Sequence, residues 1–223
     1  YDAAGLLTQL TSTDTNIGGA DTIVSGTGDD VIVGGLANDD IDGDEGDNLV
    51  IGDSGSIAFI EFLRWQIAET ITPTLGGNDT IALGSGNDAV LAGVGDDTVT
   101  IDGGNNFVAA DNGRVTANTA SQVTRLETLN EANGGTDDVT TGDGHDIVLG
   151  GTADDTISAG NGNNIVIGDN GFVTLNAAGL LLTIDSKLVD IGGDDRITTG
   201  TGKDIAIGGF GKDIIAVGEG NNA

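Results

Sequence analysis

Aspartates recur at the ends of short glycine-rich stretches, nine residues apart. In GGNDTIALGSGNDAVLAGVGDDTVT, residues 76–100, this spacing joins Asp79, Asp88 and Asp97. Glycine tolerates backbone conformations that other residues resist, so such a turn can gather several carbonyl oxygens around one point. Carboxylates from two stacked turns would complete an oxygen cage of the kind that Ca²⁺ prefers, with about 6–8 ligands. Mg²⁺ fits less well because it demands near-ideal octahedral geometry and keeps its waters. The spacing therefore predicts calcium sites.

The charge balance agrees with a cation as the partner. The 223 residues include 36 acidic and only 7 basic ones, for a net charge of -29. Apolar residues make up 37% and recur at fixed intervals, which a disordered acidic tail would not show. So acidic a surface is a poor partner for nucleic acid or anionic membranes, and no apolar run is long enough to insert into a bilayer. Cys is absent, so disulfides and thiolate metal sites are not available. The chain begins with Tyr1 and not with Met, so we expect a piece of a longer protein.

Two periods are nested in the chain. The nine-residue unit reads x-G-x-G-x-D-x-U-x, where U is apolar, and clear copies start at Ser25, Leu83, Thr141 and Thr199, 58 residues apart. Each block holds three units with Asp at the sixth position, a fourth with Asn, and a fifth in which Val115 or Val173 stands where Asp is expected. We divide the chain into the end of one block (1–17), three full blocks (18–75, 76–133, 134–191) and a partial block (192–223), within one continuous solenoid.

The units favour short strands. U is often β-branched and is flanked by outward residues such as Thr98 and Thr100, the period-two pattern of a strand. Two units, or 18 residues, can form one coil of a parallel solenoid whose U residues stack into a narrow core. The fold class is therefore all-β. Five units and the longer segment after them would count as six strands, or three coils, per block.

The longer segment of each block allows several structures. Asn112-Gly113 and Asn170-Gly171 resemble hairpin turns. Two apolar columns recur from block to block: Leu7, Trp65, Val123 and Leu181, and Leu10, Ala68, Leu126 and Ile184. The segment could cap the solenoid, protrude as a hairpin or dock on a neighbour. We expect it to cover one side of the solenoid.

The units resemble the RTX nonapeptide repeat, GGxGxDxUx, over almost the whole chain except the longer segments. The resemblance implies a right-handed parallel β-roll with calcium held between turns of successive coils, about two or three ions per block. On one side it would pair Asp21 with Asp39, Asp79 with Asp97, Asp137 with Asp155 and Asp195 with Asp213. The other side would pair Asp30 with Asn48, Asp88 with Asn106, Asp146 with Asn164 and Asp204 with Asn222.

The chain departs from the family pattern in three ways. The first Gly is often missing, Asn replaces every fourth Asp, and the fifth unit has lost its carboxylate. Asp53, Asp111 and Asp169 in that fifth unit could compensate as ligands from another turn position or merely cap the turn. Sites with Asn should be weaker. Aspartates can also serve only the backbone of a turn, but twelve in register favour calcium.

Other features give little chemistry. His145 is the only His and precedes Asp146 in a turn, so with no Cys present a nucleophile and base cannot be assembled. We expect no enzyme activity in this chain. Arg64 and Trp65 predict local packing or a partner contact. The outward turn positions form no continuous row of Thr, which disfavours ice binding.

Two functions fit these observations. The first is a calcium-stiffened structural section of a secreted or cell-surface bacterial protein: an adhesin stalk, a surface layer component or an extracellular filament. Its partners would be neighbouring repeats of a longer chain or copies of itself, end to end. Its resemblance to very large RTX proteins implies type I secretion and folding outside the cell. The alternative is the C-terminal secretion and folding module of an extracellular enzyme such as a protease or lipase.

Overall fold

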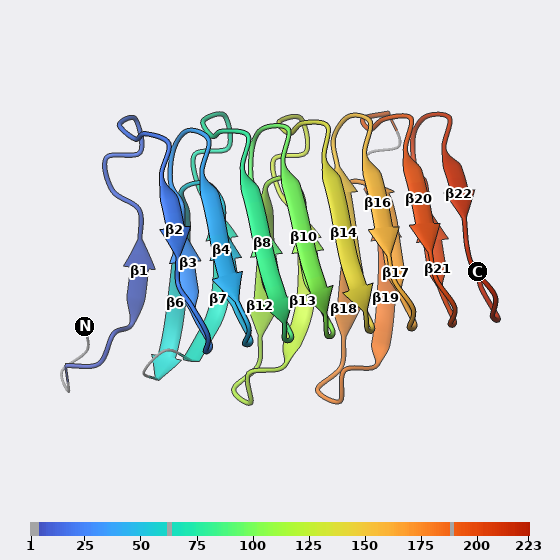
Figure 1. The fold of residues 1–223 in the computed structure, drawn as a ribbon, viewed down its shortest axis with the longest axis horizontal. Coiled ribbons are helices and arrows are strands. Elements are labelled where there is room, and N and C mark those ends of the chain that lie inside the picture. Colours follow the sequence, from blue (N-terminus) through green and yellow to red (C-terminus); the bar gives the residue numbers. More distant parts are fainter. Residues whose placement is uncertain (1–4, 62–63, 188–189) are drawn as a thin grey trace.

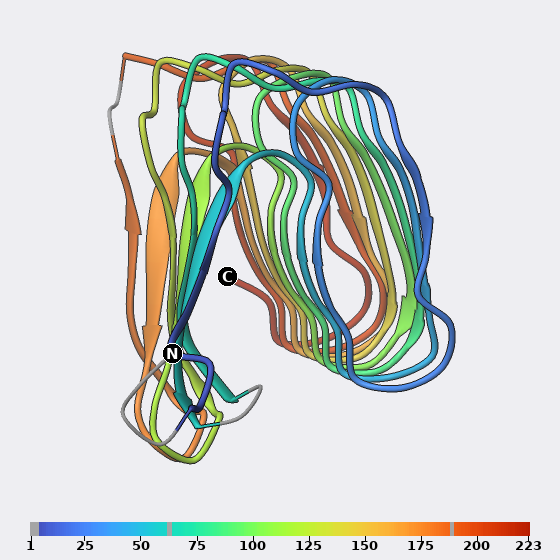
Figure 2. The same ribbon diagram turned by 90° about the vertical axis from the view of Figure 1, so that its left-hand side faces the viewer.

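The chain folds into three stacked β-sheets. The structure is a computed structural model that describes residues 5–61, 64–187 and 190–223. Figure 1 shows the strands side by side along the long axis, and Figure 2, viewed along that axis, shows a flattened coil with a third layer against it. The described residues contain no helix, and hence none long and apolar enough to cross a membrane.

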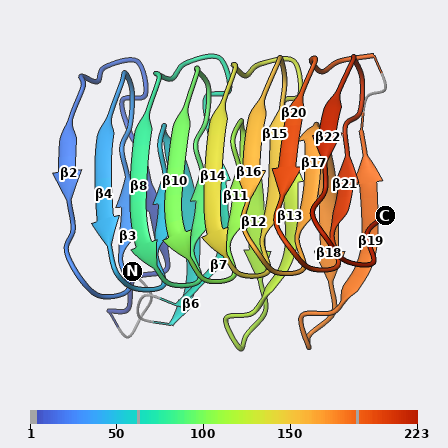
Figure 3. The same ribbon diagram turned by 45° about the vertical axis from the view of Figure 1, so that its right-hand side comes forward.

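Two parallel sheets form the solenoid, which we call the roll. The first, which we call the outer sheet, consists of β2 (Thr22–Val24), β4 (Asp40–Asp44), β8 (Thr80–Ser85), β10 (Thr98–Gly103), β14 (Asp138–Asp143), β16 (Thr156–Ala159), β20 (Arg196–Thr199) and β22 (Ile214–Ala216). The second, the middle sheet, consists of β3 (Val31–Val33), β5 (Leu49–Ile51), β9 (Ala89–Leu91), β11 (Phe107–Ala109), β15 (Ile147–Gly151), β17 (Ile165–Asp169) and β21 (Ile205–Ile207). Figure 3 shows the outer sheet in front of the middle one. The chain alternates between the sheets, which confirms the predicted solenoid of two units per coil.

The third sheet is antiparallel and is built from the longer segments. This hairpin sheet contains β1 (Gln9–Thr11), β6 (Gly55–Glu61), β7 (Arg64–Thr70), β12 (Gly113–Ala117), β13 (Val123–Thr128), β18 (Gly171–Leu175) and β19 (Leu181–Ser186). Successive coils are therefore offset by 18 residues (Thr22 beside Asp40) or, where a hairpin intervenes, by 40 (Asp40 beside Thr80). The expectation of three coils per block is wrong: the fifth unit leaves the roll and becomes the first strand of the hairpin.

Asn112-Gly113 and Asn170-Gly171 lie at the entrances of their hairpins and not at the turns, which corrects their predicted role. Asn112 is buried and donates from Nδ2 to the carbonyl oxygens of Pro73 (3.3 Å) and Asn133 (3.1 Å). The turn itself lies five residues on, where the backbone N–H of Ser121 donates to the Asn118 carbonyl oxygen. Asn112 thus holds the corner at which the chain leaves the roll.

Two apolar cores separate the three layers. The U residues of the outer and middle sheets, such as Val99 and Val148, form the first core, as predicted. The second core lies between the middle and hairpin sheets, so the prediction that the longer segments cover one side of the solenoid is confirmed. Val115 and Val173 are buried in this second core, which explains why the fifth unit lacks Asp. Inner strands of the middle sheet such as β5 and β9 are buried on both faces, whereas outer-sheet strands such as β10 alternate between exposed and buried residues.

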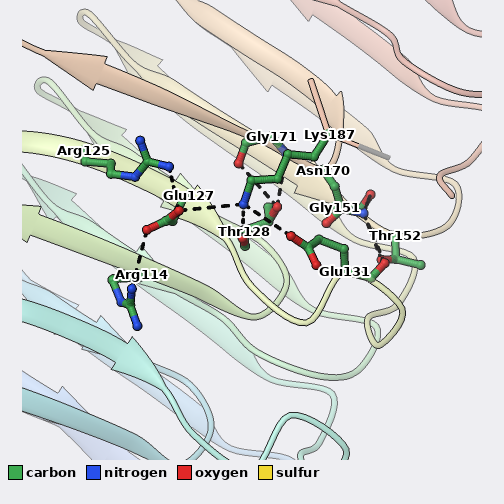
Figure 4. Close-up of polar contacts among 10 residues, drawn as sticks. All are labelled: Arg114, Arg125, Glu127, Thr128, Glu131, Gly151, Thr152, Asn170, Gly171 and Lys187. Atoms are coloured by element: carbon green, nitrogen blue, oxygen red, sulfur yellow. Dashed lines mark hydrogen bonds and ion pairs between the residues drawn. The ribbon is translucent and has the colours of Figure 1, made fainter. Parts of the chain in front are cut away.

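Ion pairs tie the hairpins of successive blocks together (Figure 4). Glu127 lies at their centre, 2.7 Å from Arg125 Nη2 and 3.7 Å from both Arg114 Nη1 and Lys187 Nζ. Burial opposes ionisation of Glu127, but the hydrogen bond and charge of Arg125, with Lys187 and Arg114, hold its pKa below the ordinary value. Arg125 also lies over the Phe172 ring, 4.1 Å from its centre. Four of the seven Lys and Arg residues thus lie in the hairpin strands or directly after them: Arg64, Arg114, Arg125 and Lys187.

Candidate metal centre

The turns that join the two roll sheets place the predicted ligands in two rows, one along each edge of the roll. Turns from the middle to the outer sheet hold the first row, which we call the aspartate edge: Asp21, Asp39, Asp79, Asp97, Asp137, Asp155, Asp195 and Asp213. Turns from the outer to the middle sheet hold the second, the mixed edge: Asp30, Asn48, Asp88, Asn106, Asp146, Asn164, Asp204 and Asn222. The hairpins are inserted into turns of the aspartate edge.

Hydrogen bonds connect the aspartate edge into one continuous ladder. The backbone N–H of each Asp donates to Oδ1 of the Asp in the next coil, for example from Asp39 to Asp79 (2.8 Å) and from Asp79 to Asp97 (2.7 Å). The ladder runs from Asp21 to Asp213. It therefore joins neighbouring blocks as well as the coils within a block, and it leaves each carboxylate its second oxygen.

That second oxygen, Oδ2, is buried without a hydrogen-bond partner in six aspartates of this edge: Asp39, Asp79, Asp97, Asp137, Asp155 and Asp195. These six residues are at most 2% exposed. Buried polar atoms are nearly always hydrogen-bonded, and leaving one unpaired costs about 1–3 kcal/mol. Six in a row on stacked turns indicate a ligand, and negatively charged oxygens call for a cation.

The pKa values of these carboxyls show how unfavourable the bare edge is. Burial, followed by the neighbouring Asp137 carboxylate, raises the pKa of Asp97 to about 9 and that of Asp155 to about 10. Burial also raises the pKa of Asp79 and of Asp195 to about 7. Without positive charge the folded edge would therefore take up protons at neutral pH.

The mixed edge forms a similar ladder with different chemistry. The Asp88 N–H donates to Oδ1 of Asn106 (3.0 Å), and the Asn106 N–H to Oδ1 of Asp146 (2.9 Å). Here every Asp stands between Asn residues, apart from Asp30 in the first coil. Burial raises the pKa of Asp88 to about 6, less than at the aspartate edge. The Asp and Asn residues that the family resemblance pairs on this side are hydrogen-bonded neighbours, and their role as calcium ligands stays a prediction.

Asp53, Asp111 and Asp169 lie where the chain leaves the roll for a hairpin, at the aspartate edge. Both carboxylate oxygens of Asp53 accept backbone N–H groups, from Gly77 (3.0 Å) and Val94 (2.6 Å). Asp111 and Asp169 repeat this arrangement in the next two blocks. Burial raises the pKa of Asp53 to about 8, and the nearby Asp79 and Asp39 carboxylates add to it. These three residues close the turns on either side of the hairpin.

The donor set of the aspartate edge fits Ca²⁺. In the described part of the chain no three acidic or His side chains converge on one point, so carboxylates must be joined by backbone oxygens. Such oxygens are at hand: a Cβ added to Gly52 would lie 2.4 Å from both Asp79 Oδ2 and the Ala92 carbonyl oxygen. Carboxylate and carbonyl oxygens around a Gly-lined space are ligands that hard cations select, and Ca²⁺ accepts irregular geometry.

The remaining candidate residues have local roles. His145 is exposed, and its Nδ1 accepts the backbone N–H of Asn163 (2.8 Å), as Asn and Asp side chains do at the same position of other coils. Trp65 packs against the second core, and Arg64 Nε donates to Ser121 Oγ (3.3 Å). Local packing therefore accounts for Trp65.

Sequence reasoning missed two residues of the mixed edge. The Thr141 hydroxyl donates to Oδ2 of Asp146 (2.9 Å), and the Thr199 hydroxyl to Oδ2 of Asp204 (3.0 Å). Both threonines are buried. Each occupies the first position of its nonapeptide, where the family pattern has Gly. The replacement of Gly by a residue with a hydroxyl was therefore a visible sign in the sequence that this position differs.

Comparison with known proteins agrees with this site. The RTX calcium-binding nonapeptide repeat matches the chain in four copies, at residues 17–55, 74–108, 140–175 and 191–223. No curated protein and no solved structure matches the chain. The four copies cover most of the sequence and contain the Asp and Asn residues of both edges except Asp137. With its Gly and Asp turns stacked on a parallel roll, this chain belongs to the RTX calcium-binding nonapeptide repeat family.

Proposed function

We propose that this chain is a calcium-dependent structural section of a secreted or cell-surface bacterial protein, such as an adhesin stalk, a surface layer component or an extracellular filament. The observation that carries the proposal is the row of six buried, unpartnered Oδ2 atoms on the aspartate edge. Proteins with these repeats are typically secreted or extracellular, which supports the location.

Folding and calcium binding would be one process. Bound Ca²⁺ supplies the positive charge that the stacked carboxylates need. The chain's own residues prepare the site: Oδ1 of each Asp accepts an N–H from the adjacent coil and sets the spacing of the turns, and Oδ2 remains available as a ligand. In a calcium-poor cytosol the carboxylates would repel one another and keep the chain unfolded. This would suit type I secretion and folding into a right-handed roll outside the cell.

The role would be structural and not catalytic. The only imidazole, His145, uses its Nδ1 as an acceptor within a turn ladder, and the buried carboxylates are committed to stacked turns. The outermost strands expose apolar residues such as Val24 on β2 and Ile214 on β22. Further 58-residue blocks of a longer chain, or copies of this one end to end, would cover them.

A calcium titration of the EDTA-stripped protein, followed by far-UV circular dichroism, tests the proposal, with Mg²⁺ as the control. A cooperative gain of β signal with Ca²⁺ alone is expected. If the stripped protein is already folded and ignores Ca²⁺, the aspartates serve only the backbone of their turns and the proposal is wrong.

A further inference from the structure

The two edges of the roll differ in what lies beside their carboxylates. On the way to the aspartate edge, the residue two places after each U residue of the middle sheet is always small: Gly34, Gly52, Ala92, Ala110, Gly150, Gly168 and Gly208. On the way to the mixed edge, the residue two places after each U residue of the outer sheet is usually larger: Ser25, Gly43, Leu83, Ile101, Thr141, Ala159, Thr199 and Val217. The two edges therefore offer different space to a cation.

At the aspartate edge this small residue leaves two oxygens facing the same point. A Cβ added to Gly150 would lie 2.5 Å from Asp155 Oδ2 and 2.0 Å from the carbonyl oxygen of Gly168, which belongs to the next coil. The same pairing of an unpartnered carboxylate oxygen with a carbonyl of the adjacent coil occurs at Gly34 and Gly52. Carboxylates also follow one another without interruption along this ladder.

At the mixed edge the same space is filled or hydrogen-bonded. Leu83 and Ile101 are buried in the first core at this position. Thr141 and Thr199 instead direct their hydroxyls at Oδ2 of Asp146 and Asp204, so these oxygens already have a donor. Only Asp30 and Asp88 of this edge have an unpartnered Oδ2.

The Asn residues of the mixed edge also use up carbonyl oxygens. Nδ2 of Asn164 donates to the Gly160 carbonyl oxygen (2.8 Å), and Nδ2 of Asn222 to that of Gly218 (2.7 Å). Asn48 and Asn106 make the same kind of contact within their own turns. An amide N–H₂ carries positive partial charge and cannot ligate a cation, so it replaces the ion as the partner of the turn carbonyl.

We infer that calcium loads along the aspartate edge alone, and that the mixed edge is a metal-free seam closed by Asn amides, Thr hydroxyls and apolar side chains. The inference rests on the proposed calcium-dependent folding and specifies where it acts. It predicts about six ions per chain, one for each aspartate-edge Asp with an unpartnered Oδ2. Loading of Asp30 and Asp88 as well would give about eight ions, and loading of all four mixed-edge Asp residues about ten.

A matched pair of variants in one block tests the seam: Asp155→Asn on the aspartate edge and Asp146→Asn on the mixed edge. Bound Ca²⁺ is counted by equilibrium dialysis with atomic emission, and the folding midpoint is read by circular dichroism against free Ca²⁺. Asp155→Asn should lose at least one ion and need about tenfold more Ca²⁺, since a charged ligand is lost. Asp146→Asn should leave both values unchanged, because the single Asn oxygen can keep the backbone N–H of Asn106 while the Asn Nδ2 donates to the Thr141 hydroxyl oxygen.

Each outcome decides the matter. Equal losses in both variants, or about eight or more ions in the unmodified chain, would overturn the seam while leaving calcium-dependent folding intact. If the unmodified chain does not respond to Ca²⁺, the proposed function fails first. Should Asp155→Asn not fold at any Ca²⁺ concentration, the ion count of the unmodified chain together with the unchanged behaviour of Asp146→Asn still tests the inference.

Discussion

Protons should replace calcium in folding this chain, because both neutralise the same buried carboxylates. The pKa is raised furthest for seven carboxyls at the aspartate edge: Asp53, Asp79, Asp97, Asp111, Asp137, Asp155 and Asp195. Burial is the largest cause in every case. An ordinary Asp has a pKa of 3.8, so the folded chain binds these protons more tightly than the unfolded chain does.

The sign and size of the effect follow from this difference. Below about pH 4 both states are protonated and the buried carboxyls carry no penalty. Above it, each carboxyl lowers the free energy of unfolding by about 1.4 kcal/mol per pH unit until its folded pKa is reached. With an intrinsic stability of about 10 kcal/mol, seven such groups bring the calcium-free chain to its midpoint about one pH unit above 3.8, near pH 5. At pH 7 the calcium-free chain should be unfolded.

The assay is far-UV circular dichroism of the EDTA-treated chain from pH 8 to pH 3.5, with size-exclusion chromatography to confirm that the acid form is monomeric. A double variant, Asp97→Asn with Asp155→Asn, removes two of the seven groups and should raise the midpoint by about 0.4 pH unit. Asn already occupies the same ladder position on the mixed edge, so the change suits the turn.

A competing explanation is that removing any two negative charges raises the midpoint pH by reducing the repulsion across the chain. A second double variant controls for this effect. Asp40→Asn with Asp138→Asn removes the same charge from exposed positions of the outer sheet and should leave the midpoint nearly unchanged. Equal shifts in the two double variants would refute the assignment to buried carboxylates. So would a calcium-free chain that is fully folded at pH 7.5.

Two further substitutions address the parts of the fold that the repeat pattern does not explain. Val115→Asp restores the nonapeptide pattern in the fifth unit but puts an unpaired charge into the second core, so the calcium-loaded protein should lose about 3–5 kcal/mol in urea denaturation, whereas the neighbouring Thr116→Asp should cost less than about 1 kcal/mol. Equal effects would place residue 115 outside the core. Gly52→Ala would force a Cβ between Asp79 Oδ2 and a carbonyl oxygen, so the Ca²⁺ midpoint should rise several-fold, whereas Gly19→Ala, which meets nothing within 4 Å, should leave it unchanged. An unaltered midpoint in Gly52→Ala would mean that this space holds no ion.

Much of the roll was predictable because its causes are local. Glycine turns, a carboxylate at the sixth position and a β-branched residue two places later each act within nine residues, so their spacing indicates coils, a parallel stack and the residues along each edge. The first core followed directly: Val99 and Val148 are buried where the pattern places them. The oxygen donors of these turns pointed to calcium, and the family resemblance added the pairing of ligands between successive coils.

The third layer was foreseen as a cover, and a hairpin was one of the structures that the longer segment allowed. What local spacing does not show is that hairpins from successive blocks join into one sheet, because strands far apart in the sequence pair there, such as β7 with β12. A partial signal existed. Middle-sheet strands such as Leu49–Ile51 are apolar throughout, as strands buried on both faces are, whereas Thr98–Gly103 alternates.

The two edges also differ in whether their carboxylate Oδ2 atoms have hydrogen-bond donors. From the sequence, Asp146 and Asp155 look alike, since each ends a glycine turn and precedes an apolar position. The Thr141 hydroxyl reaches Asp146 Oδ2 within one turn, five residues away, so this contact is set locally. Only the stacking of coils buries Asp155 Oδ2 and leaves it unpartnered. Local spacing can determine which residue types reach an edge and which donors lie in the same turn. Whether a carboxylate oxygen without such a donor becomes buried, and so requires a cation, depends on the coils that the fold stacks beside it.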